Sequence, residues 1–115
     1  KPGARILNSA DPDAPSGLEI ARTIARLLDH EWEEVLLDGE PADGLGAHPW
    51  DAEHPIVLDT TAALELGYVP AGDYEATVAD EVEWLVDSAR RGDLRLDDEF
   101  FERFLDYAAE DRRRR

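Results

Sequence analysis

Two histidines, a tryptophan and an aspartate lie close together in one loop and are the residues of this chain best suited to contact a small molecule. They are His48, Trp50, Asp51 and His54, within residues 38–55, which carry three glycines and three prolines. Imidazole can donate, accept or carry a proton, a carboxylate accepts hydrogen bonds, and indole adds a broad apolar face. Long loops without periodicity are uncommon inside compact domains and often serve a function. The sequence leaves two interpretations of Trp50 open: its indole packs beneath the loop, or it is presented to a ligand.

A metal site is the first alternative for these histidines. It would combine His48 and His54 with Asp51 or Asp59. Five residues separate the two histidines on a proline-bearing loop, which matches no standard zinc pattern. The chain also has no cysteine. We therefore predict no metal site.

The sequence offers no pair of residues for acid–base chemistry on a cofactor. None of the three tyrosines has a lysine four residues further on, because Lys1 is the only lysine. The glycines of residues 44–46 do not lie between a strand and a helix, as the glycines of a dinucleotide-binding loop do. We predict no catalytic and no cofactor-binding residue in this chain.

The first part of the chain predicts a βαβ unit. Apolar residues indicate one strand at residues 4–10 and another at residues 31–37. Between them, Ser16 and Glu19 form a capping box that begins an amphipathic helix ending near residues 29–30. The short connections predict two parallel strands with a right-handed crossover.

The remainder predicts a short strand and three further helices. The strand is at residues 56–59, and caps or stops mark the helix ends at Thr60, Gly67, Asp73, Gly92 and Asp97. The predicted fold class is therefore α/β, an α+β-like fragment with a small mixed or parallel sheet and no complete Rossmann domain. The two strands of one βαβ unit are too few to form a stable domain alone.

Charge and composition exclude several classes of partner. The formal net charge of −16 repels phosphate backbones, so we expect no nucleic-acid binding. A DNA-mimicking inhibitor of a basic partner is a minor alternative. No apolar run approaches the roughly 18 residues of a membrane-spanning helix, so we expect no membrane partner. The lack of cysteine fits a reducing cytoplasm. Because the chain has no methionine and no signal-peptide pattern follows Lys1, we interpret it as a part of a longer protein.

Residues 59–70, DTTAALELGYVP, resemble the segment "D-x-S/T-K/A-A-x-x-x-L-G-Y/W-x-P" near the C-terminus of extended short-chain dehydrogenases/reductases, the NAD-dependent epimerase/dehydratase family. Residues 6–11, ILNSAD, are similar to the family's "hydrophobic-x-Asn-hydrophobic-x-Asp/Gly" strand, and residues 16–30 to the helix after it. Residues 73–85 are similar to the family's next helix. The resemblance covers residues 4–90 in the family's order.

The resemblance implies that residues 1–92 are the substrate-binding C-terminal region of such an enzyme, with a helical extension at residues 93–115. It implies an N-terminal Rossmann domain in the parent protein, which would bind NAD or NADP and carry the catalytic Tyr-x-x-x-Lys pair. The parent would be an epimerase, dehydratase or reductase acting on a sugar or related small molecule. This chain has neither the pair nor the dinucleotide loop, so alone it would not catalyse.

The resemblance also implies that residues 44–54 form one wall of the substrate cleft. His48, Trp50, Asp51 and His54 are then the substrate-binding candidates. The family's nucleotide-sugar members carry a phosphate-binding arginine three residues before an aspartate, and counting back from Asp51 gives His48. This departure favours a substrate other than a UDP- or dTDP-sugar, although a protonated His48 could still pair with a phosphate.

A free-standing acidic interaction module without catalysis is the alternative interpretation. The last predicted helix carries an apolar stripe that must be buried against this chain or a partner, made of Phe100, Phe101, Phe104 and Leu105. We expect self-association through exposed apolar surface under either interpretation. The upstream reading frame distinguishes them, because only the enzyme requires a glycine-rich loop and a Tyr-x-x-x-Lys pair there.

Overall fold

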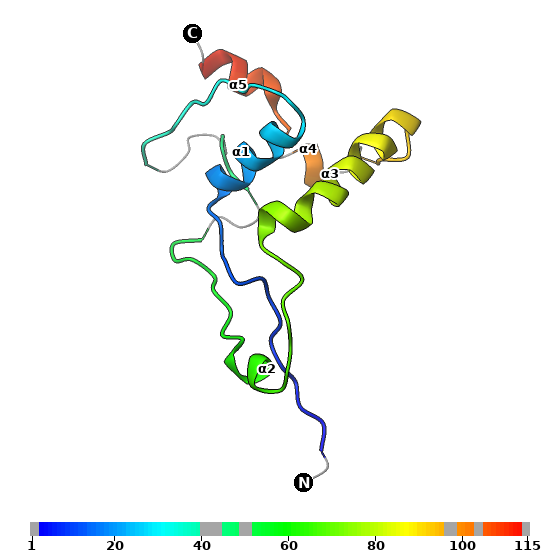
Figure 1. Ribbon diagram of the computed structural model, residues 1–115. Coiled ribbons are helices and arrows are strands. Elements are labelled where there is room, and N and C mark those ends of the chain that lie inside the picture. The colour runs from blue at the N-terminus through cyan, green and yellow to red at the C-terminus, as the bar shows by residue number, and fades with distance from the viewer. Residues whose placement is uncertain (1–2, 40–44, 49–51, 96–98, 103–104, 114–115) are drawn as a thin grey trace.

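The computed structural model of the chain describes residues 3–39, 45–48, 52–95, 99–102 and 105–113. Within these ranges the backbone forms helices joined by extended segments (Figure 1). The helices are α1 (Gly17–Leu27), α2 (Thr61–Glu65), α3 (Tyr74–Arg91), α4 (Glu99–Glu102) and α5 (Tyr107–Arg113).

Helix α1 begins at the capping box that the sequence predicts. The Glu19 amide donates to Ser16 Oγ at 3.3 Å, and the Ser16 amide donates to Glu19 Oε2 at 2.7 Å. These two bonds satisfy backbone donors that have no partner inside the helix. The helix ends slightly earlier than predicted, at Leu27, and Asp29 takes a left-handed backbone conformation with φ 49°.

Helices α1 and α3 pack against each other and form the one contact between helices that the described residues show. Thr23 and Ala25 of α1 are buried, as are Val82 and Ser88 of α3. An ion pair between Arg26 and Glu75, 2.8 Å long, joins the two helices at their exposed edge. The buried side chains of both helices are small or medium in size, so the packing buries little apolar area.

Helix α3 has the ends that the sequence predicts. Asp73 Oδ1 accepts a hydrogen bond from the Ala76 amide at 2.8 Å, as an N-cap does. Gly92 closes the helix with φ 75°, a left-handed conformation that glycine adopts at low cost. Both predictions are confirmed.

Helix α2 lies far from α1 and α3, at the end of an extended arm, which we define as residues 3–15 and 52–73 (Figure 1). Its N-terminus differs from the prediction, because Thr60 makes no side-chain cap. Asp59 Oδ1 instead accepts from the Thr61 amide at 2.9 Å. Hydrogen bonds from the Thr61 side chain and from this amide lower the pKa of Asp59. Gly67 stops the helix as predicted, with φ 92°.

The prediction of an α/β fold is wrong, because the described residues contain helices and no strand. Residues 4–10, 31–37 and 56–59 have no regular secondary structure, and no backbone hydrogen bond joins them to one another. A strand forms only when a neighbour pairs with its N–H and C=O groups. The apolar pattern marks positions that avoid water but does not supply that neighbour. The βαβ unit and the small mixed or parallel sheet are therefore corrected to extended segments beside helices.

The last predicted helix is also corrected, because it is interrupted. Residues 105–106 are not helical, and α5 begins after them. Asp106 Oδ1 accepts from the Ala109 amide at 2.9 Å, so this aspartate caps a new helix instead of continuing the old one. Of the predicted apolar stripe, Phe101 is half-buried and Leu105 is exposed. Phe104 and the side chain of Phe100 lie outside the described residues.

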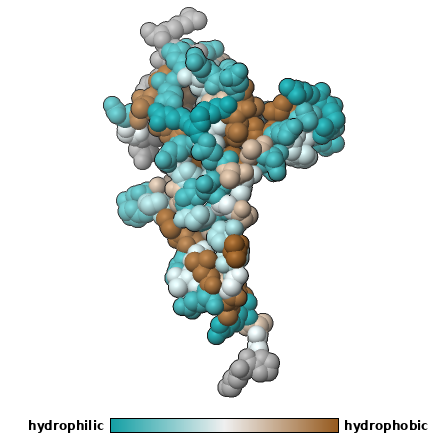
Figure 2. All heavy atoms as spheres, in the orientation of Figure 1, coloured by the Kyte–Doolittle hydropathy of each residue, from teal (hydrophilic) through white to brown (hydrophobic). Residues whose placement is uncertain are grey.

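The molecule is elongated and leaves much apolar surface in water. Its radius of gyration is 18.1 Å, whereas a compact domain of this length has about 13 Å. Brown patches in Figure 2 follow the extended arm and the region between α1 and α3. Large apolar side chains exposed on the arm are Ile6, Leu7, Ile56, Val57, Leu58, Leu64, Leu66 and Val69. In the part of the chain that the structure describes, no helix has the length and apolarity needed to cross a membrane.

Candidate functional site

The predicted contact residue His48 lies against the first turn of α1. A Cβ atom on Gly17 would be 3.3 Å from His48 Nε2 and 3.7 Å from its Cε1, so the imidazole rests directly over the glycine. The His48 side chain is otherwise exposed. It makes no hydrogen bond or ion pair with another described residue.

His48 reaches this position because the chain turns back along α1 after the helix ends. We call residues 30–39 and 45–48 the return segment. Trp32 lies beside Ala25, Glu34 binds Arg22, and His48 covers Gly17, so the segment contacts α1 in reverse order. Near its end, Gly46 turns with φ 73° next to the Leu37 side chain.

The face of α1 toward the return segment carries small residues. Gly17, Ala21 and Ala25 are spaced by four residues and therefore share one side of the helix. Ala25 is buried and Ala21 half-buried. Small side chains let a backbone pass close to the helix, which explains why the segment follows this side.

The strongest contact along this path is the pair between Arg22 and Glu34. Arg22 Nε donates to Glu34 Oε1 at 2.7 Å, and Nη2 donates to Oε2 at 2.6 Å, which is the two-pronged geometry that a guanidinium favours. The hydrogen bonds from Arg22 lower the pKa of Glu34 and those to Glu34 raise the pKa of Arg22. Both side chains are well exposed, so water screens the pair. Its main effect is to fix where the return segment lies.

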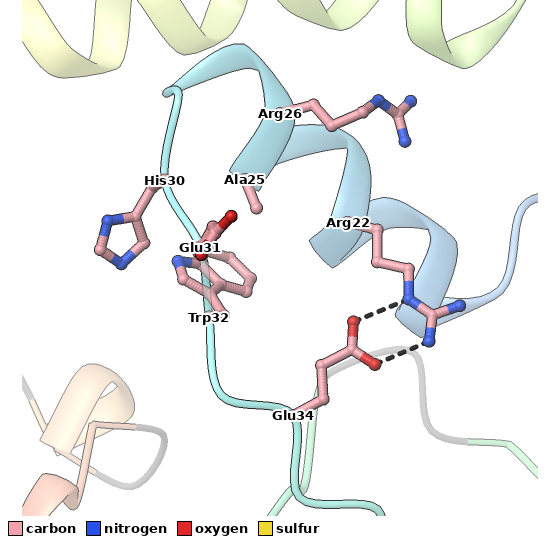
Figure 3. Close-up of a pocket in the computed structure, with 7 residues that line it drawn as sticks. All are labelled: Arg22, Ala25, Arg26, His30, Glu31, Trp32 and Glu34. Atoms are coloured by element: carbon pink, nitrogen blue, oxygen red, sulfur yellow. Dashed lines mark hydrogen bonds and ion pairs between the residues drawn. The ribbon is translucent and has the colours of Figure 1, made fainter.

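A shallow hollow of about 420 Å³ opens between α1 and the start of the return segment (Figure 3). It is lined by Arg22, Ala25, Arg26, His30, Glu31, Trp32 and Glu34. The indole of Trp32 lies under Ala25. It meets the His30 ring edge to face, with 6.3 Å between the ring centroids. Arg22 and Arg26 each already bind a carboxylate, so the lining is polar without a strong excess of either charge. The hollow can accept a small ring that stacks on indole, but it holds no arranged acid–base pair.

The other predicted contact residues are not assembled with His48 in the described structure. His54 is exposed in a bend of the chain and has no polar contact with His48 or with other described residues. Trp50 and Asp51 lie outside the described residues. Among the residues that are described, no three histidine, aspartate or glutamate side chains approach closely enough to hold a metal ion.

Sequence reasoning missed Arg22, Trp32 and Glu34. A signal was present, since the small residues of α1 mark the side that a neighbouring segment can approach. Trp32 and Glu34 fell inside a predicted strand, which hid them as site residues.

Comparison of the chain with protein-family models, with curated proteins and with solved structures finds no match. The resemblance to extended short-chain dehydrogenases/reductases therefore stays a prediction from the motif residues. Any functional proposal rests on those motifs and on the geometry described above.

Proposed function

We propose that this chain is the substrate-binding C-terminal region of an NAD(P)-dependent epimerase, dehydratase or reductase that acts on a sugar or related small molecule. In this proposal the cofactor and the catalytic pair belong to an N-terminal Rossmann domain of the parent protein. The chain works in the cytoplasm, covered by that domain, and supplies one wall of the substrate cleft.

The observation that carries the proposal is a contact between the two motifs on which the resemblance depends. Asn8 belongs to the "hydrophobic-x-Asn" motif, and Asp59 begins the segment that ends at Pro70. Asn8 Nδ2 donates a hydrogen bond to the Asp59 carbonyl at 3.2 Å, across a sequence separation of 51 residues. Two motifs of one family should meet in space if they belong to one structural unit, and these two do.

The exposed apolar surface of the extended arm supports the need for a covering domain. Ile6 is 100% exposed and Val69 is 80% exposed, on segments that the Asn8–Asp59 contact holds together. Each such side chain gains roughly 1.5–3 kcal/mol when it is fully buried. Self-association through this surface stays a prediction, and the net charge of −16 on each chain would oppose it.

His48 is the residue of this chain that we propose to contact the substrate. It stands where the family's nucleotide-sugar members have a phosphate-binding arginine, so the proposal favours a substrate without a nucleotide phosphate. A neutral imidazole offers one donor and one acceptor, which suits a hydroxyl or carbonyl group.

The test compares this chain with the complete reading frame that contains it. We expect the upstream frame to encode a glycine-rich strand–helix loop and a Tyr-x-x-x-Lys pair. The longer protein should bind NADH or NADPH in calorimetric titrations, while this chain alone binds neither. A start codon directly before Lys1, or tight dinucleotide binding by the chain alone, would overturn the proposal.

Substitutions on the arm test the covering domain separately. Ile6→Ser and Val69→Ser should change the free energy of unfolding of this chain by no more than about 0.5 kcal/mol, because both side chains are already in water. In the longer protein each should cost about 2 kcal/mol, because the cover buries them. Arg5→Ala, on the same exposed arm, is the control and should be neutral in both. Equal effects in the chain and the longer protein count against a cover at this surface.

A free-standing acidic interaction module is the second candidate, and the same exposed apolar surface favours it. Here the cover is a separate protein instead of a domain of the same chain. The upstream reading frame decides between the two candidates. Light scattering of the chain, with and without the proteins encoded by neighbouring genes, measures directly whether a separate protein binds it.

A further inference from the structure

We infer that Gly17 is a positioning residue for His48. It is the absence of a side chain at the first position of α1 that lets the imidazole lie over the helix end. The inference rests on the proposed role of His48 in substrate binding, and it names a second residue that sets where His48 can act.

The geometry leaves little room for any other residue at position 17. A Cβ there would lie 3.3 Å from Nε2, 3.7 Å from Cε1 and 3.8 Å from Cδ2 of His48. The first distance is shorter than ordinary van der Waals contact, where carbon atoms rest about 3.5–4.0 Å apart. The added methyl group would therefore push the ring away from the helix.

The backbone of Gly17 does not itself require glycine. The glycines with positive φ in the described chain are Gly39, Gly46, Gly67 and Gly92, and Gly17 is not among them. Its conformation is helical, and alanine is favoured over glycine in helices. Glycine at this position therefore makes α1 less stable than alanine would. The structure shows one advantage of glycine here, which is the space that the His48 ring occupies.

The return segment makes the placement of His48 specific. The Arg22–Glu34 pair fixes the segment in the middle of α1, and Leu37 beside Gly46 supports the turn that leads to His48. These contacts lie along the path that brings the His48 ring to the surface of Gly17.

Nuclear magnetic resonance of the full chain tests the contact without any assay of activity. We expect a cross-peak between the His48 ring protons and the Gly17 α protons. In Gly17→Ala that cross-peak should weaken and the His48 ring resonances should move, while those of His30 and His54 stay in place. An absent cross-peak in the unchanged chain, or unmoved His48 resonances in the variant, would overturn the inference.

Two further variants provide the controls. Gly3→Ala adds a methyl group where nothing lies within 4 Å, so the His48 resonances should not move. His48→Ala removes the ring, and in that background Gly17→Ala should only strengthen α1, seen as more helical circular dichroism. If Gly17→Ala weakens α1 equally with and without the His48 ring, the glycine serves the helix and not His48.

Activity of the longer protein tests the consequence for the substrate. Gly17→Ala should raise KM about tenfold with kcat unchanged, which is the effect of one lost hydrogen bond to the substrate. In the His48→Ala background the same substitution should leave KM unaltered. A moved His48 ring without any change in KM would refute the substrate role of His48, while the resonance data would still establish the contact with Gly17.

Discussion

The Arg22–Glu34 pair shows what a single residue contributes to this molecule. The two side chains are 12 positions apart and meet only because the chain reverses after α1. The pair lies on the surface, so its value is in geometry more than in stability. It fixes the return segment between the hollow beside Trp32 and the position of His48.

The lowered pKa of Glu34 gives the first prediction. Because Arg22 favours the ionised carboxylate, the pair contributes above the ordinary pKa of glutamate, and this contribution is lost as pH falls through the lowered value. Carbon-detected titration should place the Glu34 pKa below the ordinary glutamate value of about 4.3 and return it there in Arg22→Ala. Arg5→Ala should leave it unchanged. A Glu34 carboxyl that titrates alike in all three proteins would contradict the pairing.

At the scale of the element, helix α3 depends on its ends more than on its packing. Val82 and Ser88 are its buried residues, and of the two only Val82 is apolar. The bond from the Ala76 amide to Asp73 and the left-handed Gly92 then have a large share in deciding where the helix begins and ends.

Substitution of the N-cap tests this dependence. Asp73→Ala should cost about 1 kcal/mol and expose the amides of the first turn of α3 to hydrogen exchange. Asp73→Asn keeps an acceptor of the same shape, so it should retain most of the protection. Loss of protection in the asparagine variant as large as in the alanine variant would show that the cap bond is not what orders this end.

Several helix ends could be read from the sequence because the residues that set them are close together along the chain, although the cap predicted at Thr60 is wrong. Ser16 with Glu19, Asp73 with Ala76, and the stop at Gly67 all involve local geometry. The strands could not, because a strand requires a partner that the apolar pattern does not identify. Residues 4–10 are apolar in the way a strand is, yet they have no paired neighbour among the described residues.

The same distinction holds at the candidate site. The loop chemistry pointed to His48, which the structure leaves accessible. The contact of His48 with Gly17 and the contact of Arg22 with Glu34 are non-local, so no short motif announced them. The interruption before α5 was missed because Asp106 fits a helix by periodicity but prefers to cap one.

At the scale of the whole molecule, the surface is far larger than a finished domain needs. The chain exposes 10192 Å², whereas a folded monomer of its mass exposes about 6,300 Å². The excess on this one chain exceeds one partner's share of an obligate interface, because such interfaces bury about 2,000–5,000 Å² counted over both partners. The buried apolar residues in the described part are Ala25, Ala63, Val82 and Ala109, three of which contribute only a methyl group.

Calorimetry should detect the small amount of buried apolar area in the isolated chain. A compact domain of 115 residues absorbs about 80 kcal/mol on unfolding near 60 °C. We expect the isolated chain to show a broad transition with well under half of that enthalpy, and to bind a dye that is sensitive to apolar surface. The longer protein should unfold sharply and bind little dye. A sharp transition of full enthalpy in the isolated chain would mean that it needs no cover.

The hydrogen bond from Asn8 to the Asp59 carbonyl has one more consequence, for how this protein can change over time. Helix α1, the return segment, the hollow and His48 all lie between those two residues. Together they form one long loop of the chain, whose two ends are joined by the hydrogen bond between Asn8 and Asp59. Doubling the length of such a loop raises the free-energy cost of closing it by only about 0.6 kcal/mol. The site can therefore gain or lose residues while the arm, and whatever covers it, stays the same.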